Sequence, residues 1–450
     1  MVKTKKDVES ELARERFRED LHTAHPPAGE RRVMRALLIG TYPFGVTKEA
    51  SEEYLEELEL LCLNLGISAA EKISCPLRAY DSATFLGKGK VEEMCELAAQ
   101  LKVDLIVLDD DIKPSQQRNL EEIFKLPVLD RTEVILDVFS KGAHTREACL
   151  QIELAQVQYQ LPRLKRLWTH LSRQRGGGVQ LKGPGETQIE TDRRILRRRQ
   201  EKLYEELEEI RSHRDTQRQE RERTSVPTFA IVGYTNAGKS TLLNALTDAG
   251  VLVEDRLFAT LDTTTRKFTL PNNQKILLVD TVGFIRKLPH LLVAAFKSTL
   301  EESVHADILI HLVDVCHPMA VEHAEATYAV LKELKADKKP IITALNKVDA
   351  CDSLSMCARM RAKYIKTVPI SALNKTGFED LLELMMKELS HQRRIVKVKI
   401  PQSNNALISE LTRLGHVFYT EYEENDVIMR VEVPVEMLGR VKPYELSLPV

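Results

Sequence analysis

The chain has 450 residues, which at about 150 residues per domain suggests about three domains. It is 43% hydrophobic, 29% charged and 5% aromatic, values that suit a globular protein and exclude a collagen-like or wholly disordered one. Lys and Arg total 65 and Asp and Glu total 67, so the formal net charge is −2. An anionic partner must therefore meet a local basic patch, because the overall field does not attract it.

The ends and the cysteines give no sign of export. No apolar run approaches the ~20 residues that span a bilayer, and no apolar signal core follows Met1. The 7 cysteines are scattered without a Cys-x-x-Cys pair, which disfavours a disulfide framework or a structural zinc site. We expect a cytoplasmic protein, and a membrane-associated fraction is left open.

Residues 1–30 are polar, and we expect a flexible tail. Residues 31–130 alternate short apolar runs with helical periodicity. Strands are expected at 36–39, 103–108 and 127–129, and helices at 51–65, where Ser51 looks like the start, 90–101 and 115–124. This alternation predicts a small α/β domain with a parallel sheet.

Residues 131–223 are predicted to form a helical hairpin. A period of 3.6 runs through Ile152 and Tyr159, Pro162 interrupts it, and a long second helix is expected over 190–222. Between the helices, 175–185 is too rich in Gly and Pro to be anything but a loop.

The first half of this hairpin is strongly basic. Between Gln160 and Gly185 there are six Lys or Arg residues and no Asp or Glu. Such a stretch suits contact with a phosphate backbone, and glycines let bare backbone approach RNA closely. A solvated helix face is the alternative. The candidate RNA-binding residues are Arg163, Lys165, Arg166, Arg173, Arg175, Gly176, Gly177, Gly178 and Lys182.

Residues 224–390 open with a phosphate-binding motif. A buried strand, 229–232, runs into G-x-x-x-x-G-K-S and then a helix, the context that this motif requires. Backbone N–H groups of the loop surround phosphate oxygens, Lys239 reaches the β and γ phosphates, and Ser240 offers a hydroxyl to Mg²⁺. The candidate nucleotide-binding residues here are Gly233, Tyr234, Thr235, Asn236, Ala237, Gly238, Lys239, Ser240 and Thr241.

Three further motifs at strand ends select GTP. After one strand, Asp280 can hold Mg²⁺ through a water and the Gly283 N–H can sense the γ-phosphate. After another, the Asp349 carboxylate can accept from N1–H and the 2-amino group of guanine, donors that adenine does not present there. A third loop can meet guanine O6. The set is Asp280, Thr281, Val282 and Gly283; Asn346, Lys347 and Asp349; and Ser371, Ala372 and Leu373. In this order these motifs resemble those of the small GTPase family.

The first switch must lie between Asp255 and Lys267, and its candidate residues are Phe258, Ala259, Thr260, Leu261 and Asp262. It needs a Thr for Mg²⁺; we favour Thr260, with Thr264 as the competitor.

The catalytic group is not identifiable from the sequence. Phe284 stands where Ras-like enzymes place a water-orienting Gln, so Gly283 and Lys239 are left to assist and unaided hydrolysis should be slow. A partner's residue, a backbone group or a further cation would complete the site. Asn236 is the position at which some bacterial GTPases help to bind K⁺, which makes a K⁺ requirement a hypothesis; a loop-bracing side chain is its alternative.

Four stretches resemble motifs of the HflX family of ribosome-associated GTPases. They are 183–194 (GPGETQIETDRR), 85–93 with 114–120, and the stretch from Asp280 to Glu302. The resemblance runs from about Arg35 to Leu389. One departure is Thr263, where the family usually has Pro after Leu-Asp; losing Pro frees φ and adds a backbone donor.

This resemblance implies a cytoplasmic factor that binds the large (50S) ribosomal subunit, rRNA and ribosomal proteins included. It implies GTPase stimulation by ribosomes and splitting of ribosomes into subunits under stress. The hairpin loop would approach the peptidyl transferase region. Some members are reported to use ATP through the N-terminal region; here 87–90 (GKGK) is the only local suggestion, and a turn or an RNA contact is the alternative.

Residues 391–450 are expected to form a small α+β domain. A strand at 395–400, a helix at 406–414 and a hairpin of 417–420 with 427–433 are predicted. The whole is then a multidomain α/β protein: a parallel N-terminal α/β domain, a helical hairpin, a Ras-like P-loop GTPase domain and this appendage. We expect a monomer that binds GTP, GDP and the ribosome but no DNA. A GTP switch for a protein or membrane partner, or a large-subunit assembly factor, are the alternatives.

Overall fold

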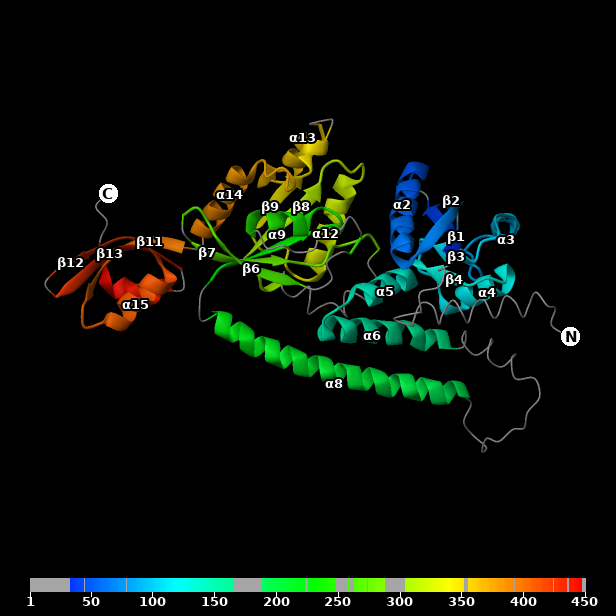
Figure 1. Ribbon diagram of the computed structural model, residues 1–450, viewed down its shortest axis with the longest axis horizontal. Coiled ribbons are helices and arrows are strands. Elements are labelled where there is room, and N and C mark those ends of the chain that lie inside the picture. Colours follow the sequence, from blue (N-terminus) through cyan, green and yellow to red (C-terminus); the bar gives the residue numbers. More distant parts are fainter. Residues whose placement is uncertain are drawn as a thin grey trace. The chain divides into compact units, whose positions relative to one another are not determined.

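The computed structural model describes the following residues: 33–43, 45–77, 79–164, 188–222, 226–247, 257–258, 263–272, 274–287, 304–351, 355–391, 393–423, 425–434 and 437–446. They fall into two compact units that divide within helix α8 after Glu208, and residues 257–258 belong to the first unit. In this part of the chain no helix is long and apolar enough to cross a membrane. Figure 1 shows the elements in chain order.

The first unit contains the N-terminal parallel sheet, with strand order β2-β1-β3-β4. Its strands are β1 (Met34–Pro43), β2 (Ile67–Leu77), β3 (Leu105–Leu108) and β4 (Val128–Asp130). Its helices are α2 (Lys48–Leu65), α3 (Lys88–Leu101) and α4 (Pro114–Phe124). The predicted parallel α/β domain is confirmed, and the sequence prediction missed β2.

Helix α2 begins earlier than predicted. The Thr47 hydroxyl accepts a hydrogen bond from the Ala50 N–H at 3.2 Å, so Thr47 and not Ser51 is the N-cap. Ser51 lies inside the helix, buried, and its hydroxyl accepts from that of Ser74 on β2 at 2.8 Å. Gly66 ends the helix at φ 82°, the left-handed conformation that favours glycine.

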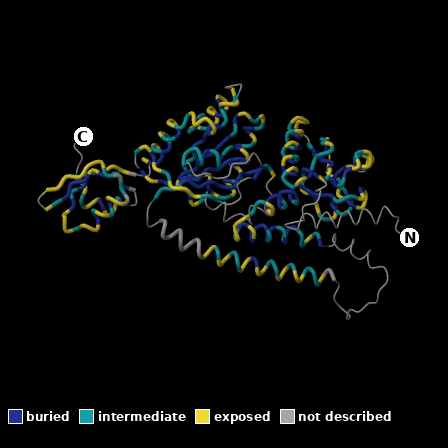
Figure 2. The backbone as a smooth tube through the Cα atoms, viewed as in Figure 1, coloured by how far each residue is buried: buried dark blue, intermediate teal, exposed yellow. Residues whose placement is uncertain are grey.

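Helices complete this unit: α5 (Arg131–Gly142), α6 (Arg146–Gln160), a 3₁₀ turn η1 (Leu161–Arg163) and the long α8 (Gln188–Glu222), of which the part up to Glu208 belongs here. The Arg199 guanidinium on α8 forms a bidentate ion pair with Glu153 on α6, in which Nε and Nη2 donate to the two carboxylate oxygens at 2.6 and 2.5 Å. Leu203 is fully buried, whereas most neighbouring α8 residues are exposed (Figure 2). Helix α8 therefore packs through a narrow stripe, as its thin apolar periodicity predicts.

The second unit contains a six-stranded sheet of order β10-β9-β8-β5-β7-β6, parallel except for β6 at the edge. Its strands are β5 (Thr228–Gly233), β6 (Thr264–Thr269), β7 (Lys275–Asp280), β8 (Ile308–Asp314), β9 (Ile341–Asn346) and β10 (Thr367–Pro369). The helices are α9 (Lys239–Thr247), α12 (Ala320–Glu333), η2 (Val348–Ala350), α13 (Ser355–Lys363) and α14 (Phe378–His391). Because parallel strands end at one edge, the loops after β5, β7, β9 and β10 converge there.

The C-terminal residues form an antiparallel sheet of order β12-β13-β11-β14. Its elements are β11 (Arg393–Pro401), α15 (Asn405–Leu414), β12 (His416–Tyr422), β13 (Asp426–Pro434), α16 (Leu438–Val441), η4 (Lys442–Tyr444) and β14 (Glu445–Leu446). The predicted α+β appendage is confirmed.

Candidate functional site

The phosphate-binding loop connects β5 to α9 and depends on two glycines. A Cβ on Gly233 would lie 2.3 Å from the Leu312 carbonyl oxygen, and one on Gly238 (φ 94°) would lie 2.5 Å from Asn346 Nδ2. Either contact is far inside van der Waals distance, so the loop tolerates no side chain at these positions. The loop therefore takes the tight course that turns backbone N–H groups toward a phosphate.

Lys239 opens α9 and is buried in this loop. Its Nζ donates to the carbonyl oxygens of Gly233 (3.3 Å) and Tyr234 (2.9 Å). Burial lowers the pKa of Lys239 to about 8, and the Asp280 carboxylate offsets only part of that effect. Phosphate oxygens are stronger acceptors than carbonyl groups, so an anionic ligand would restore the full charge of this ammonium.

Ser240 and Asp280 lie together at the edge where β5 and β7 end. The Ser240 hydroxyl donates to Asp280 Oδ2 at 2.6 Å, and Asp280 is fully buried as the last residue of β7. Mg²⁺ prefers hard oxygen ligands such as these, and this donor set fits that ion. A Cβ on Gly283 would lie 2.9 Å from Lys239 Nζ, so the backbone of Gly283 runs directly beside the phosphate-binding lysine.

Phe284 faces the core and its backbone ties two motifs together. The side chain is 1% exposed. Its N–H donates to the Gly233 carbonyl at 3.0 Å, and its carbonyl accepts from the Thr235 N–H at 2.7 Å. Phe284 thus fixes the second switch motif to the phosphate loop, and its buried phenyl ring carries no group that can hydrogen-bond to water.

The guanine-recognition loops are braced by Asn346. Its Nδ2 donates to the Ala237 carbonyl (2.8 Å), and its Oδ1 accepts from the Ala372 N–H (2.9 Å). One amide therefore holds the phosphate loop and the loop after β10 in register. Asp349 lies on η2 and is exposed, so its carboxylate can accept from a base.

Lys347 and Ser371 shape the same end of the site. Lys347 adopts a left-handed φ of 65°, and its Nζ pairs with Asp314 Oδ2 at 2.8 Å. Ser371 is buried and its hydroxyl accepts from the Asn374 N–H at 3.0 Å, whereas Leu373 is 74% exposed. The four predicted motifs are therefore brought to one edge of the sheet.

The first switch is described only at its margins. Phe258 belongs to the N-terminal unit, where its ring packs edge-on against Phe139 with centroids 4.5 Å apart. It is 6% exposed, so its side chain is buried against Phe139, and its predicted membership of the nucleotide-binding set stays a prediction. Thr264 begins β6 and pairs with Asp280 across the ladder. Ala259, Thr260, Leu261 and Asp262 lie outside the described residues, so the choice of Thr260 as Mg²⁺ ligand stays a prediction.

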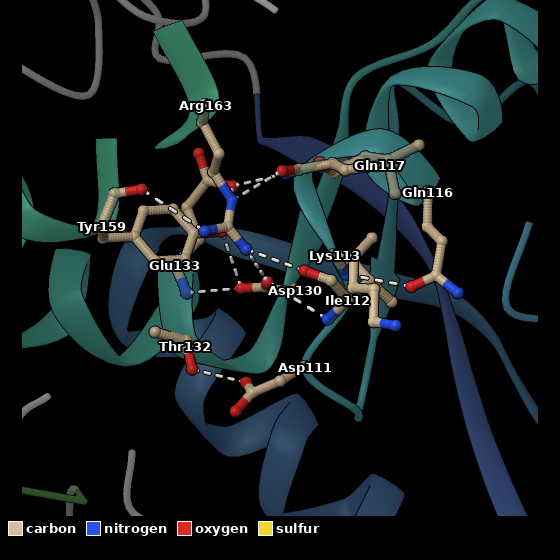
Figure 3. Close-up of polar contacts among 11 residues, drawn as sticks. Asp111, Ile112, Lys113, Gln116, Gln117, Asp130, Thr132, Glu133, Tyr159 and Arg163 are labelled. Atoms are coloured by element: carbon tan, nitrogen blue, oxygen red, sulfur yellow. Dashed lines mark hydrogen bonds and ion pairs between the residues drawn. The ribbon is translucent and has the colours of Figure 1, made fainter. Parts of the chain in front are cut away.

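Arg163 corrects the expected RNA-binding set (Figure 3). Its side chain is 12% exposed. The guanidinium lies 3.6 Å above the Tyr159 ring and donates to Gln117 Oε1 (3.0 Å), the Ile112 carbonyl (2.8 Å) and Asp130 Oδ2 (3.1 Å). It is an internal cross-link of the N-terminal unit. The other basic candidates and their glycines lie outside the described residues.

Asp130 is the centre of the cross-link that Arg163 makes. Burial, followed by the nearby Glu133 carboxylate, raises the pKa of Asp130 to about 7, although Arg163 opposes the shift. The Tyr159 hydroxyl donates to Asp130 at 2.9 Å. This network joins the end of β4 to the end of α6, which is a structural task.

The N-terminal GKGK segment forms an ordinary helix start. Gly87 is the N-cap of α3 in an extended conformation, and Lys90 Nζ lies 2.8 Å from Glu93 on the next turn. The helix start and this ion pair explain the positions of Gly87 and Lys90 without a bound phosphate.

The sequence analysis missed two residues beside the site, His323 and Asp314. Tyr234 stacks flat on His323 of α12, with centroids 3.7 Å apart, and its hydroxyl accepts from the Arg286 N–H at 2.7 Å. Asp314, which pairs with Lys347, is the last residue of β8. Its position at a strand end was a usable signal, whereas the contact with His323 depends on packing alone.

Comparison with known proteins gives three family matches in succession. Residues 52–140 match the family described as GTP-binding GTPase N-terminal, 142–221 the GTP-binding GTPase middle region, and 228–347 the 50S ribosome-binding GTPase family. A crystal structure of a GTP-binding protein from the archaeon Sulfolobus solfataricus with GDP covers 80% of this chain and 99% of its own, at 26% identity and a TM-score of 0.41.

Two curated relatives cover nearly the whole chain. The GTPase HflX of Chlamydia pneumoniae is 44% identical over 422 residues, which are 93% of this chain and 89% of the relative. That of Escherichia coli K12 is 38% identical over 416 residues, 92% and 97% of the two chains. The chain therefore belongs to the HflX family of GTPases.

Proposed function

We propose that this GTPase is a ribosome factor that binds the large subunit in its GTP form, splits or recycles ribosomes under stress, and is released after hydrolysis. The observation that carries the proposal is the match of residues 228–347 to the 50S ribosome-binding GTPase family, a stretch that contains the phosphate loop, Asp280 and Asn346. The proposed location is the cytoplasm, where its ribosomal partner is found.

In this function the chain's own groups bind and orient GTP. The loop N–H groups and Lys239 hold the β and γ phosphates, and Asp349 accepts from the guanine edge. Ser240 and Asp280 would hold Mg²⁺, which when bound neutralises charge on the phosphate oxygens. Asn346 keeps the phosphate and base ends at a fixed separation, since it bonds to Ala237 and Ala372 together.

The position of Phe284 supports stimulation by a partner. Its side chain is in the core and its backbone N–H and C=O are both bonded within the protein. The residue after Gly283 therefore supplies no group that orients water, and hydrolysis waits for a group from elsewhere. This supports a GTPase that keeps its bound GTP until it binds the ribosome.

The proposed RNA contact is the acid-free basic stretch after Arg163. With Arg163 assigned to the internal network, five basic residues remain in it: Lys165, Arg166, Arg173, Arg175 and Lys182. Each phosphate that such a residue neutralises releases counterions, so the contact should weaken steeply with salt.

The decisive experiment measures GTP hydrolysis with and without purified large subunits. We expect stimulated turnover that falls at least tenfold when Arg173, Arg175 and Lys182 are changed together to Ala. The matched control removes three charges elsewhere, by changing Arg194, Arg197 and Arg198 on α8 to Ala; it should retain most of the stimulation. The rate without subunits should be the same in both variants.

Other outcomes select the alternatives. No stimulation by subunits or whole ribosomes would leave a GTP switch for a protein partner. Stimulation by incomplete large subunits but not by mature ones would identify an assembly factor. If both triple variants lost stimulated turnover equally, the effect would come from overall charge attraction and not from a specific contact of the basic stretch.

We also propose K⁺ as an auxiliary cation near Asn236, which is exposed and adopts a left-handed φ of 59° in the phosphate loop. A carbonyl-bearing side chain in that position supplies the oxygen ligand that K⁺ requires. Equal hydrolysis rates in K⁺ and Na⁺ buffers would refute this proposal.

A further inference from the structure

Two cysteines flank the guanine-recognition motif and reach across to each other. Cys316 follows β8 by two residues, and Cys351 follows Asp349 by two. The Cys316 thiol donates to the Lys347 carbonyl at 2.9 Å, and the Cys351 thiol donates to the Val315 carbonyl at 3.8 Å. The two thiols are also near enough to interact with each other. Each thiol therefore donates to a backbone carbonyl in the loop that contains the other cysteine.

The backbone between these cysteines is part of the nucleotide site. The Val315 N–H donates to the Asn346 carbonyl at 3.2 Å. Asp314 accepts from the Cys316 N–H at 3.0 Å through Oδ1 and pairs with Lys347 Nζ at 2.8 Å through Oδ2. A change in the distance between the two sulfurs would therefore shift segments that are hydrogen-bonded to Asn346 and paired with Lys347.

We propose that Cys316 and Cys351 form a redox modification site, at which a peroxide joins the two thiols in a disulfide that weakens guanine-nucleotide binding. The inference rests on the proposed use of this site for GTP. One thiol sulfur attacks a peroxide oxygen, giving a sulfenic acid and one water. The second thiol sulfur then displaces the hydroxyl as a second water. The two thiols lose two electrons and two protons, and the peroxide is reduced to water.

Access separates this pair from the three buried cysteines, and the contacts between their loops separate it from the accessible Cys149 and the partly exposed Cys95 on α3. Cys316 is exposed and Cys351 is partly exposed, whereas Cys62, Cys75 and Cys357 are buried. Burial raises the pKa of the Cys62 thiol to about 12 and also shields its sulfur from a peroxide, whereas the exposed Cys316 is not shielded in this way. Cys149 is exposed too, but it lies in the N-terminal unit, on α6. It serves as the matched control.

The charges around Cys316 set the character of the site. Desolvation, followed by Cys351 and Asp314, raises the pKa of Cys316 to about 11, while Lys347 opposes the shift. Few thiolates are present at neutral pH, so oxidation is slow there.

The disulfide would disturb the base-recognition loop. A disulfide needs its sulfurs at ~2.05 Å, well inside hydrogen-bonding distance, so the loops must draw together. Bond formation also removes the S–H donor from the Lys347 carbonyl, at a residue held in the left-handed region. Because η2 (Val348–Ala350) connects Lys347 to Cys351, the carboxylate of Asp349 moves with it.

The test treats reduced full-length protein with hydrogen peroxide at pH 8.5, where more thiolate is present. Peptide mapping without reductant detects the cross-link, and a fluorescent GDP analogue reports affinity. We expect a peptide joining Cys316 to Cys351, a GDP dissociation constant raised at least tenfold, and recovery with dithiothreitol. Cys316→Ser and Cys351→Ser should each abolish the peroxide effect, whereas Cys149→Ser should leave it intact.

Two results would overturn the proposal: loss of the free thiols without a joined 316–351 peptide, or an undiminished peroxide effect on GDP affinity in Cys316→Ser. The mapping depends only on the sulfurs, so it remains informative even if ribosomes fail to stimulate the enzyme. Failure of the reduced protein to bind GDP would instead count against the proposed function.

Discussion

His311 offers a quantitative test of the energetics of the nucleotide-binding sheet. It lies in the middle of β8, is 0% exposed, and contacts the Tyr328 ring edge-on at 5.0 Å. Neither ring nitrogen has a hydrogen-bond partner among the described residues. Burial lowers the pKa of His311 to about 3 from an ordinary value of 6.5. We predict that His311→Leu stabilises this unit, and more so in acid.

The size of the effect follows from proton linkage. A histidine whose folded pKa is depressed contributes no penalty above pH 6.5, and stability is lost as pH falls from 6.5 toward 3, because only the unfolded chain takes up the proton. Between pH 7.5 and pH 5.0 this loss is about 2 kcal/mol. His311→Leu removes it. At pH 7.5 the variant also escapes the cost of two unpaired ring nitrogens, a gain on the order of 1 kcal/mol.

Native-state hydrogen exchange followed by mass spectrometry is the appropriate assay, since a chain with several domains need not unfold in one step. The reporter is the peptide that contains β8, in wild type and variant at both pH values. After correction for intrinsic exchange rates, the protection of wild type should fall about 30-fold more than that of His311→Leu on going to pH 5.0. His323, which also titrates abnormally, is present in both proteins and cancels.

A control on the same strand separates packing from titration. Ile310→Val removes one buried methyl group and should lower protection by about 1 kcal/mol at both pH values alike. The reasoning fails if His311→Leu and wild type lose equal protection between pH 7.5 and 5.0. It also fails if Ile310→Val reproduces the pH-dependent difference.

Three further predictions concern other positions. Asp349→Asn should weaken GDP binding by about 100-fold, since an amide cannot accept from both guanine donors, while xanthosine diphosphate, with an oxygen at that position, should bind better; titration calorimetry with both nucleotides checks this. Phe284→Gln should lower the melting temperature and leave unstimulated GTP hydrolysis unchanged, because the side chain enters the core; a faster rate would contradict that placement. Arg163→Met should destabilise the N-terminal unit by about 3 kcal/mol, since Asp130 loses its buried partner, and adding Asp130→Asn should recover part of the loss; exchange at β4 measures both, and no recovery would exclude the pairing as the cause.

Much of the nucleotide site was predictable because its motifs are local. The phosphate loop needs glycines, a lysine and a serine at fixed spacing between a strand and a helix, and Gly233 to Ser240 supply them. Asp280 and Asn346 end parallel strands and Ser371 follows one, so chain order alone placed them at one edge. The helix and strand periods of the C-terminal residues were equally informative.

The strand β2 was missed for a physical reason. Its sequence, Ile67–Leu77, carries Glu71 and Lys72, and most of its residues are only partly buried. It lies at the edge of the sheet, a position where strands commonly carry charged side chains, so its pattern does not read as a buried strand. Its pairing with β1 comes from long-range hydrogen bonds, which leave no local signal.

The sequence by itself predicted a GTPase and the chain order of its folded parts, because glycine conformation, strand–loop–helix spacing and periodicity are properties of neighbouring residues. Only the tertiary structure decided what individual side chains do. Arg163 belongs to a basic stretch, yet its guanidinium pairs with Asp130 and lies over the Tyr159 ring. Phe258 belongs to the predicted switch segment, yet its ring packs on Phe139. Cys316 and Cys351 are 35 positions apart, yet the Cys316 thiol donates to the Lys347 carbonyl and the Cys351 thiol donates to the Val315 carbonyl. Burial and pairing depend on residues brought together by folding, and composition carries no record of which partner each charge or thiol will find.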